Sequence, residues 1–165
     1  MQSDDQKPKL LISACLLGHP VRYDGNGKLL DNSLLKTWRD EGRLVVACPE
    51  MMAGFSAPRL PCEITGGLSG DDVLDGRASI VDSHGKIETT QFIKGAELTL
   101  KMAQDNNCHF ALLTENSPSC GSNFIHDGSF TGRKIPGMGV VAALLIKHGM
   151  QVFSETEISS LAKVI

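Results

Sequence analysis

The chain has 165 residues and lacks several features that would place it in a common functional class. Its longest apolar run, Val140 to Ile146, is far shorter than the roughly 20 residues of a membrane-spanning helix. Acidic residues (19) outnumber basic ones (16) and no basic cluster occurs, so we expect no nucleic-acid-duplex partner. The first nine residues, MQSDDQKPK, include acids and no apolar run, unlike a secretory signal. We therefore expect a cytoplasmic protein without a membrane partner.

The common short metal and nucleotide motifs are also missing. The sequence contains no CxxC pair, no HxH or HExxH pattern, and no GxGxxG or Walker motif. It does contain five cysteines, an odd number, in a chain long enough to form a core without disulfides. A disulfide framework is therefore not expected, and each cysteine has to be considered by its position: Cys15, Cys48, Cys62, Cys108 and Cys120.

Short apolar segments alternate with amphipathic ones along the chain. The apolar segments predict four strands, and the amphipathic segments between and after them predict helices. This alternation indicates a single α/β domain over residues 9–165, after a loose tail over residues 1–8. We expect a mainly parallel four-stranded sheet with helices on both faces, a Rossmann-like arrangement. The predicted strands are 9–15, 43–48, 109–114 and 150–154, and the predicted helices are 31–42, 89–107, 139–149 and 154–162.

Two local patterns refine this prediction. Helix starts are indicated by Asp31, Asn32 or Ser33, by Thr89 or Thr90, and by the capping-box pattern SETE from Ser154. Residues 71–88 break the alternation of strands and helices. Within them, the pattern around Ser83-His84-Gly85 predicts a small β-hairpin insertion.

Three of the cysteines follow predicted strands. Cys15 ends the first strand, Cys48 ends the second, and Cys120 lies in the loop after the third. In an open α/β sheet, ligands bind beyond the carboxyl ends of the strands, so these three thiols should meet at one edge. Cys108 precedes its strand and should be structural at the opposite edge, whereas Cys62 lies further into its loop. The spacings match no short zinc-finger or ferredoxin signature. The three cysteines therefore either bind a metal or cluster or are simply small buried residues, and both interpretations stay open.

Polar residues accompany these thiols. Glu50 lies two residues after Cys48 and is either a reactive carboxylate or a helix cap. Ser117 and Ser119 lie just before Cys120 in the sequence. A serine at such a position can also simply hydrogen-bond to the backbone of the turn. Further polar residues in loops that should face the same crevice are Arg22, Asp24, Arg59, Glu63 and His126.

Four longer segments together resemble a known family. They read ACLLGHPVRYDG, CPEMMAGFSAPRLPCEI, FIKGAELTL and NSPSCGSNFIHDGSFTG, the last followed by GVVAALL. In this order, and covering nearly the whole chain after residue 8, they resemble the 2-thiouracil desulfurase family.

The resemblance implies an oxygen-sensitive [4Fe–4S] cluster held by Cys15, Cys48 and Cys120, with Glu50 and Ser117 as catalytic residues. The implied reaction is the non-redox conversion of a thiolated pyrimidine, 2-thiouracil, to uracil and hydrosulfide. The substrate sulfur would occupy the open iron, Ser117 would position the attacking water, and Glu50 would move protons. No residue pattern specifies a sulfur acceptor.

Two alternatives from other classes remain open on the residues alone. One is a structural or regulatory zinc-thiolate module that uses the same three thiols. The other is a hydrolase with Cys120 as the nucleophile, a mechanism that ordinarily requires a histidine to activate the thiol.

Overall fold

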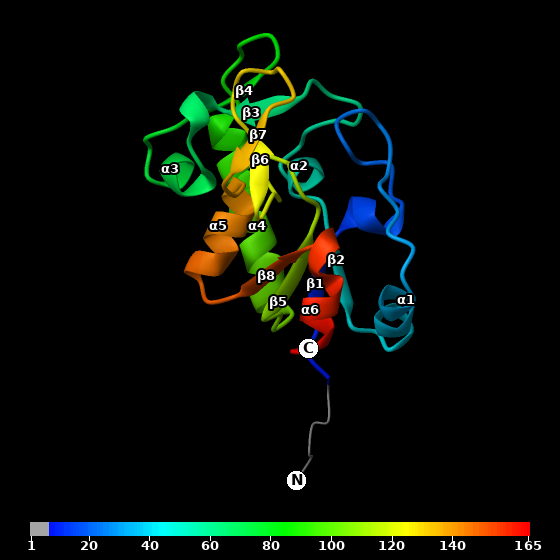
Figure 1. Ribbon diagram of the computed structural model, residues 1–165. Helices are drawn as coiled ribbons and strands as arrows, with labels where there is room; N and C mark the ends of the chain where they lie inside the picture. Colours follow the sequence, from blue (N-terminus) through cyan, green and yellow to red (C-terminus); the bar gives the residue numbers. More distant parts are fainter. Residues whose placement is uncertain (1–6) are drawn as a thin grey trace.

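A four-stranded parallel sheet forms the centre of the molecule in the computed structural model, which describes residues 7–165 (Figure 1). The strand order is β2-β1-β5-β8, and each neighbouring pair is parallel. The predicted sheet is therefore confirmed. All four carboxyl ends meet at one edge because the strands run in the same direction. The strands are β1 (Leu10–Ser13), β2 (Leu44–Ala47), β5 (Phe110–Leu113) and β8 (Gln151–Ser154).

Helices cover both faces of this sheet, as predicted, and alternate residues of β1 explain why. Leu11 belongs to the core beneath α4 (Thr89–Asp105) and α5 (Val140–Lys147), whereas Leu10 and Ile12 belong to the core beneath α1 (Ser33–Asp40) and α6 (Ile158–Ala162). Successive strand residues point to opposite faces, so a strand buried on both faces is apolar throughout.

The short elements are η1 (Ala14–Leu17), α2 (Pro49–Met52), η2 (Thr65–Gly67), α3 (Gly70–Leu74) and η3 (Glu155–Glu157).

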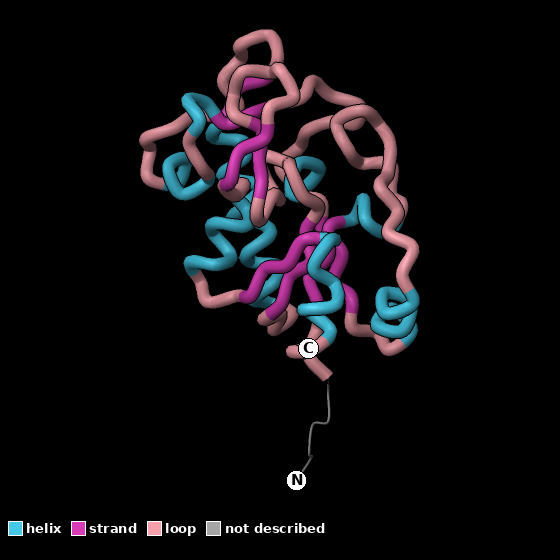
Figure 2. Tube along the Cα trace, viewed as in Figure 1, coloured by secondary structure: helices cyan, strands magenta, loops and turns pink. Residues whose placement is uncertain are grey.

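Two small two-stranded antiparallel sheets lie beyond the carboxyl edge of the main sheet (Figures 1 and 2). One pairs β3 (Cys62–Ile64) with β4 (Ile80–Asp82), and the other pairs β6 (Phe124–His126) with β7 (Lys134–Pro136). The predicted turn after β4 exists, because Val81 bridges to Ile87, but the main partner of β4 is β3. The β6–β7 hairpin was missed, since its three-residue strands are too short to show an alternating pattern.

The helix starts agree with the prediction in two cases and differ in one. The Asn32 side chain caps α1 by accepting the Leu34 N–H at 2.8 Å. Ser154 forms the expected capping box with Glu157, although it opens η3 before α6 begins. The prediction that Thr89 or Thr90 caps α4 is wrong. Glu88 occupies that position, and the Thr89 hydroxyl instead accepts the Ile80 N–H at 3.0 Å, which joins α4 to β4.

The predicted loose tail lies mostly outside the described residues, which begin at Lys7. Lys7 pairs with Glu41 at 3.2 Å, and the Pro8 carbonyl accepts a hydrogen bond from Arg43 Nε at 2.8 Å. Across residues 7–165, no helix combines the length and the apolarity that crossing a membrane requires.

The start of α5 packs directly against the loop that follows β5. The N–H groups of Gly139, Val140 and Val141 donate to the carbonyls of Gly121, Pro118 and Ser119 at 2.7–2.8 Å. These are N–H groups that a helix leaves without internal partners. A side chain at Gly139 would place its Cβ 2.3 Å from the Ser119 carbonyl carbon and oxygen. Gly139 is therefore required for close approach.

Replacing Gly139 by alanine should force this loop away from α5. We expect Gly139→Ala to lower the free energy of unfolding by an amount near the upper end of roughly 1–3 kcal/mol, as overpacking does. Gly149→Ala is the control, because its added Cβ meets nothing within 4 Å and only its left-handed backbone is strained, at about 1 kcal/mol. Urea denaturation measures both, and equal losses in the two variants would contradict the packing argument.

Candidate active site

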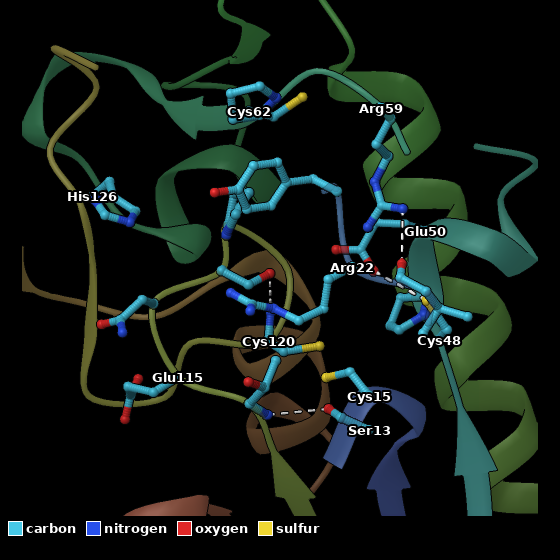
Figure 3. Close-up of a pocket in the computed structure, with 18 of the residues that line it drawn as sticks. Ser13, Cys15, Arg22, Cys48, Glu50, Arg59, Cys62, Glu115, Cys120 and His126 are labelled. Atoms are coloured by element: carbon cyan, nitrogen blue, oxygen red, sulfur yellow. Dashed lines mark hydrogen bonds between the residues drawn. The ribbon is translucent and has the colours of Figure 1, made fainter. Parts of the chain in front are cut away.

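A cavity of about 440 Å³ opens at the carboxyl edge of the sheet, between this edge and the two small antiparallel sheets (Figure 3). Its walls come from the ends of β1, β2 and β5, from the loop before β3, and from the β6–β7 hairpin. This is the edge at which parallel α/β sheets bind their ligands. The cavity therefore lies where the strand-end positions of the cysteines predict a site.

The three predicted thiols all line this cavity. Cys15 lies in η1 directly after β1, Cys48 begins α2 after β2, and Cys120 lies in the loop after β5. All three are free cysteines. Figure 3 shows the sulfurs of Cys15 and Cys120 directed toward each other, with Cys48 beside Glu50. Cys108 precedes β5, is buried in a core cluster and does not line the cavity, as expected for a structural cysteine.

Glu115, which sequence reasoning missed, shapes the loop that carries Cys120. Its carboxylate accepts the N–H groups of Ser122, Asn123 and Phe124 at 2.8–3.1 Å. Burial by itself would raise the pKa of Glu115, but these N–H donors outweigh it, and the pKa lies below its ordinary value. Glu115 thus stays ionised and closes the loop. A carboxylate just before the SPSCGS turn was the only signal of this role.

Ser117 binds the turn backbone within the same loop. Its Oγ accepts the N–H groups of Ser119 and Cys120 at 3.0 and 3.2 Å. Both lone pairs of the hydroxyl are occupied by these bonds, whereas its hydrogen is free to donate. Ser117 also lines the cavity. The structure therefore allows Ser117 to donate a hydrogen bond to a bound molecule but not to accept a proton.

Glu50 is a buried carboxylate held between two side chains. Ser119 Oγ donates to Glu50 Oε1 at 2.5 Å, and Cys48 Sγ donates to Oε2 at 3.7 Å. Neither bond goes to the backbone of α2, so Glu50 does not act as a cap of that helix. Ser119 itself is almost fully buried, and sequence reasoning named it without recognising this contact. The pair joins α2 to the Cys120 loop.

Burial controls the ionisation of the cavity thiols. Burial raises the pKa of Cys15, and it raises the pKa of Cys120 well above its usual range. Burial and, to a smaller extent, the negative charge of Glu50 raise the pKa of Cys48 to about 11. Without a bound metal the three groups are therefore neutral thiols at pH 7. Metal binding would have to release their protons.

The donor set fits a multinuclear cluster better than a single ion. Within residues 7–165, no three Cys, His, Asp or Glu side chains converge closely enough to hold one metal ion. In a cluster each thiolate binds a different iron atom, so the sulfurs stand further apart than around one zinc ion. The three soft sulfur donors around this cavity are of the type that iron in such clusters binds.

Other predicted polar residues lie around the cavity. Arg59 lines it and donates to the carbonyls of Val21 and Ser56 at 2.9 and 3.1 Å, which fixes the loop before β3. Arg22 lines it and stacks over Tyr23, whereas Asp24 binds the Asn26 N–H instead of facing the cavity. Three further residues named from the sequence also line the cavity: Cys62, Glu63 and His126. Burial raises the pKa of Cys62 to about 12.

The fold and the cavity define a class: an α/β protein with three thiols and a buried carboxylate at the carboxyl edge of a parallel sheet. The sequence model of one family, 2-thiouracil desulfurase, matches residues 10–157. This chain belongs to the 2-thiouracil desulfurase family, as the resemblance predicted.

Two individual proteins illustrate the relationship. The uncharacterized protein YbbK of Bacillus subtilis (strain 168) is 46% identical over 152 residues, which cover 92% of this chain and 99% of YbbK. A solved structure, the [4Fe-4S]-dependent thiouracil desulfidase TudS, is similar with a TM-score of 0.86 and 42% identity. That match covers 94% of this chain and 96% of TudS.

The raised thiol pKa values predict how the metal-free protein responds to alkaline pH. Above the ordinary thiol pKa the unfolded chain loses protons, whereas folded Cys48 keeps its proton until about pH 11. The unfolded state then binds fewer protons, so stability falls as pH rises from about 9 to about 11. The free energy of unfolding of metal-free Cys48→Ser, measured by urea denaturation, should fall less steeply over this pH range than that of the metal-free parent. Identical slopes for Cys48→Ser and the parent would contradict the shift.

Proposed function

We propose that this protein is a [4Fe–4S]-dependent desulfurase that converts the thiocarbonyl of a thiolated pyrimidine to a carbonyl, with 2-thiouracil as the representative substrate. The observation that carries the proposal is the meeting of Cys15, Cys48 and Cys120 around one cavity, with buried Glu50 among them. Family membership and the similarity to TudS, a [4Fe-4S]-dependent thiouracil desulfidase, support the same chemistry.

The reaction balances without electron transfer. Water supplies the oxygen, the C=S bond is replaced by C=O, and the sulfur leaves as hydrosulfide. Bound through three thiolates, the cluster would present one iron without a protein ligand, a Lewis-acidic position that suits a soft sulfur atom. The remaining requirements are to orient the pyrimidine, to place one water and to move its protons.

Glu50 meets the requirement for a proton acceptor. Ser119 holds one carboxylate oxygen, which fixes the orientation of the group, and the other oxygen lies beside Cys48, next to the proposed iron site. A carboxylate in this position takes a proton from the attacking water and returns it to the leaving sulfur. Ser117 serves as a hydrogen-bond donor that orients the water or the substrate, because both lone pairs of its hydroxyl are occupied.

The two alternatives are disfavoured by specific observations. A single zinc ion lacks a converging set of three donors within the described residues. A Cys120 nucleophile requires a thiolate, but burial and the nearby charge of Glu50 raise the pKa of Cys120 well above its usual range. The hydrogen-bond partners found for the site join Glu50 to Ser119 and Cys48, with no histidine among them.

Anaerobic reconstitution with iron and sulfide tests the function and its ligands together. We expect the parent protein and Cys108→Ala to load iron and acid-labile sulfide, and to release uracil and hydrosulfide from 2-thiouracil in equal amounts without a reductant. Cys15→Ala, Cys48→Ala and Cys120→Ala should each fail to load stably. Full loading of Cys120→Ala would overturn the three-thiol site, and a loaded parent without turnover would overturn the function.

The roles of Glu50 and Ser117 are separable from metal binding. Glu50→Gln should lower kcat by roughly 100-fold or more with iron content unchanged, as expected on removing a general acid–base group. Ser117→Ala should also lower kcat while retaining iron, because it removes a donor and not a ligand. Iron content and turnover are measured on the same sample. Near-normal turnover in a loaded variant would remove that residue from the mechanism.

A further inference from the structure

The loop between β6 and β7, residues 127–133, forms a fixed part of the cavity wall. Its first residue is held on both sides: the Asp127 carbonyl accepts the Gly67 N–H at 3.1 Å, and the Asp127 N–H donates to the Arg133 carbonyl at 3.0 Å. The Asp127 side chain also accepts the Ser129 N–H at 2.9 Å. The loop is thus attached both to its own hairpin and to the segment that follows β3.

A buried carboxylate attaches the centre of this loop. Glu63, in β3, is only 7% exposed, and its Oε1 accepts the N–H groups of Gly128 and Phe130 at 2.9 and 3.2 Å. No lysine or arginine in residues 7–165 forms an ion pair with Glu63. Burying a carboxylate without a cation is unfavourable, so the two N–H bonds are the compensation for its position.

Phe130 adopts a backbone conformation that is unfavourable for a bulky residue. Its φ is +56°, and the only other described non-glycine residues with positive φ are two asparagines, a residue type that tolerates this region. Such a conformation persists only where the surroundings impose it, and it occurs most often at functional sites. Here Glu63 holds the Phe130 N–H, and Phe130, 36% exposed, lines the cavity that contains the three thiols.

We propose that Phe130 is the substrate-contacting residue on which the planar thiolated heterocycle stacks, and that Glu63 is a positioning residue that holds Phe130 in place. This inference rests on the proposed function. The thiols lie at the sheet edge and Phe130 comes from the hairpin beyond that edge, so the two line different parts of one cavity. A heteroaromatic ring gains from stacking on an aromatic face whatever its substituents, so Phe130 selects flat cyclic thiocarbonyl compounds.

Phe130→Leu removes the aromatic face while keeping an apolar side chain of similar bulk. We expect the KM for 2-thiouracil to rise about 10-fold or more in the iron-loaded variant, with kcat changed less than about 2-fold. Phe130→Tyr keeps the ring and should retain the parent KM. With 5,6-dihydro-2-thiouracil, whose ring is no longer flat and aromatic, Phe130→Leu should raise KM much less.

The positioning role of Glu63 has its own test. Glu63→Gln retains an oxygen that can accept both N–H groups and should keep a near-parent KM, whereas Glu63→Ala should raise KM as Phe130→Leu does. If Glu63 acts through Phe130, the double variant Glu63→Ala/Phe130→Leu should have a KM no higher than the worse single variant. Gly128→Ala provides a second route, because its Cβ would lie 2.6 Å from the Ile64 carbonyl and displace the same loop.

These outcomes separate the two proposals. Turnover by the parent with an unchanged KM in Phe130→Leu, or equal increases for the flat and the dihydro substrate, overturns the stacking role and leaves the desulfurase function standing. If the KM increases of the two single variants multiply in the double variant, Glu63 does not act through Phe130 and its positioning role is overturned. If Glu63→Ala does not load iron, Gly128→Ala replaces it, and an unchanged KM in Gly128→Ala then overturns the positioning role. A loaded parent without any turnover contradicts the desulfurase function and, with it, this inference.

Discussion

The N–H groups at the start of α5 bind the carbonyls of the loop after β5, and the arrangement of the cavity depends on that contact. A helix start offers donors without internal partners, and here Pro118, Ser119 and Gly121 satisfy them. The contact requires a glycine at position 139, because any side chain would collide with Ser119. It fixes the backbone that carries Cys120 and so brings this thiol to the thiols that end β1 and β2.

Three carboxylates organise the rest of the site, each held by a different set of donors; Glu50 and Glu63 are buried, and Glu115 is half-buried. Glu115 collects backbone N–H groups and closes the Cys120 loop, whereas Glu63 collects two and holds the β6–β7 loop. Glu50 differs because both of its partners, Ser119 and Cys48, are side chains. Backbone N–H donors attach Glu115 and Glu63 to the loops that they shape. A carboxylate held only by a hydroxyl and a thiol remains available for proton transfer, which is why the proposed chemistry is assigned to Glu50.

Two different parts of the molecule form the two walls of the cavity. The parallel sheet with its two cores supplies a rigid edge where thiols from three strand ends converge. The two small antiparallel sheets supply the opposite wall of the cavity, with Phe130, His126 and Cys62 among its residues. In the proposed function, the sheet edge binds the reactive group and the β6–β7 hairpin recognises the heterocycle. Such a division would let this hairpin vary with the substrate without disturbing the thiols.

The sequence by itself determined the four strands, a cap for α1 at one of residues 31–33, the Ser154 capping box and the placement of three cysteines at one edge of the sheet. These features depend on local periodicity and on the rule that parallel strands end at one edge. Three features were decided by the tertiary structure alone. Ser119 donates a hydrogen bond to Glu50, and the Thr89 hydroxyl accepts one from β4 instead of capping its own helix. The β6–β7 hairpin, which the sequence did not predict, places Phe130 in the cavity wall. The Ser119–Glu50 bond joins residues 69 positions apart, and a contact of that range leaves no periodic trace in either segment.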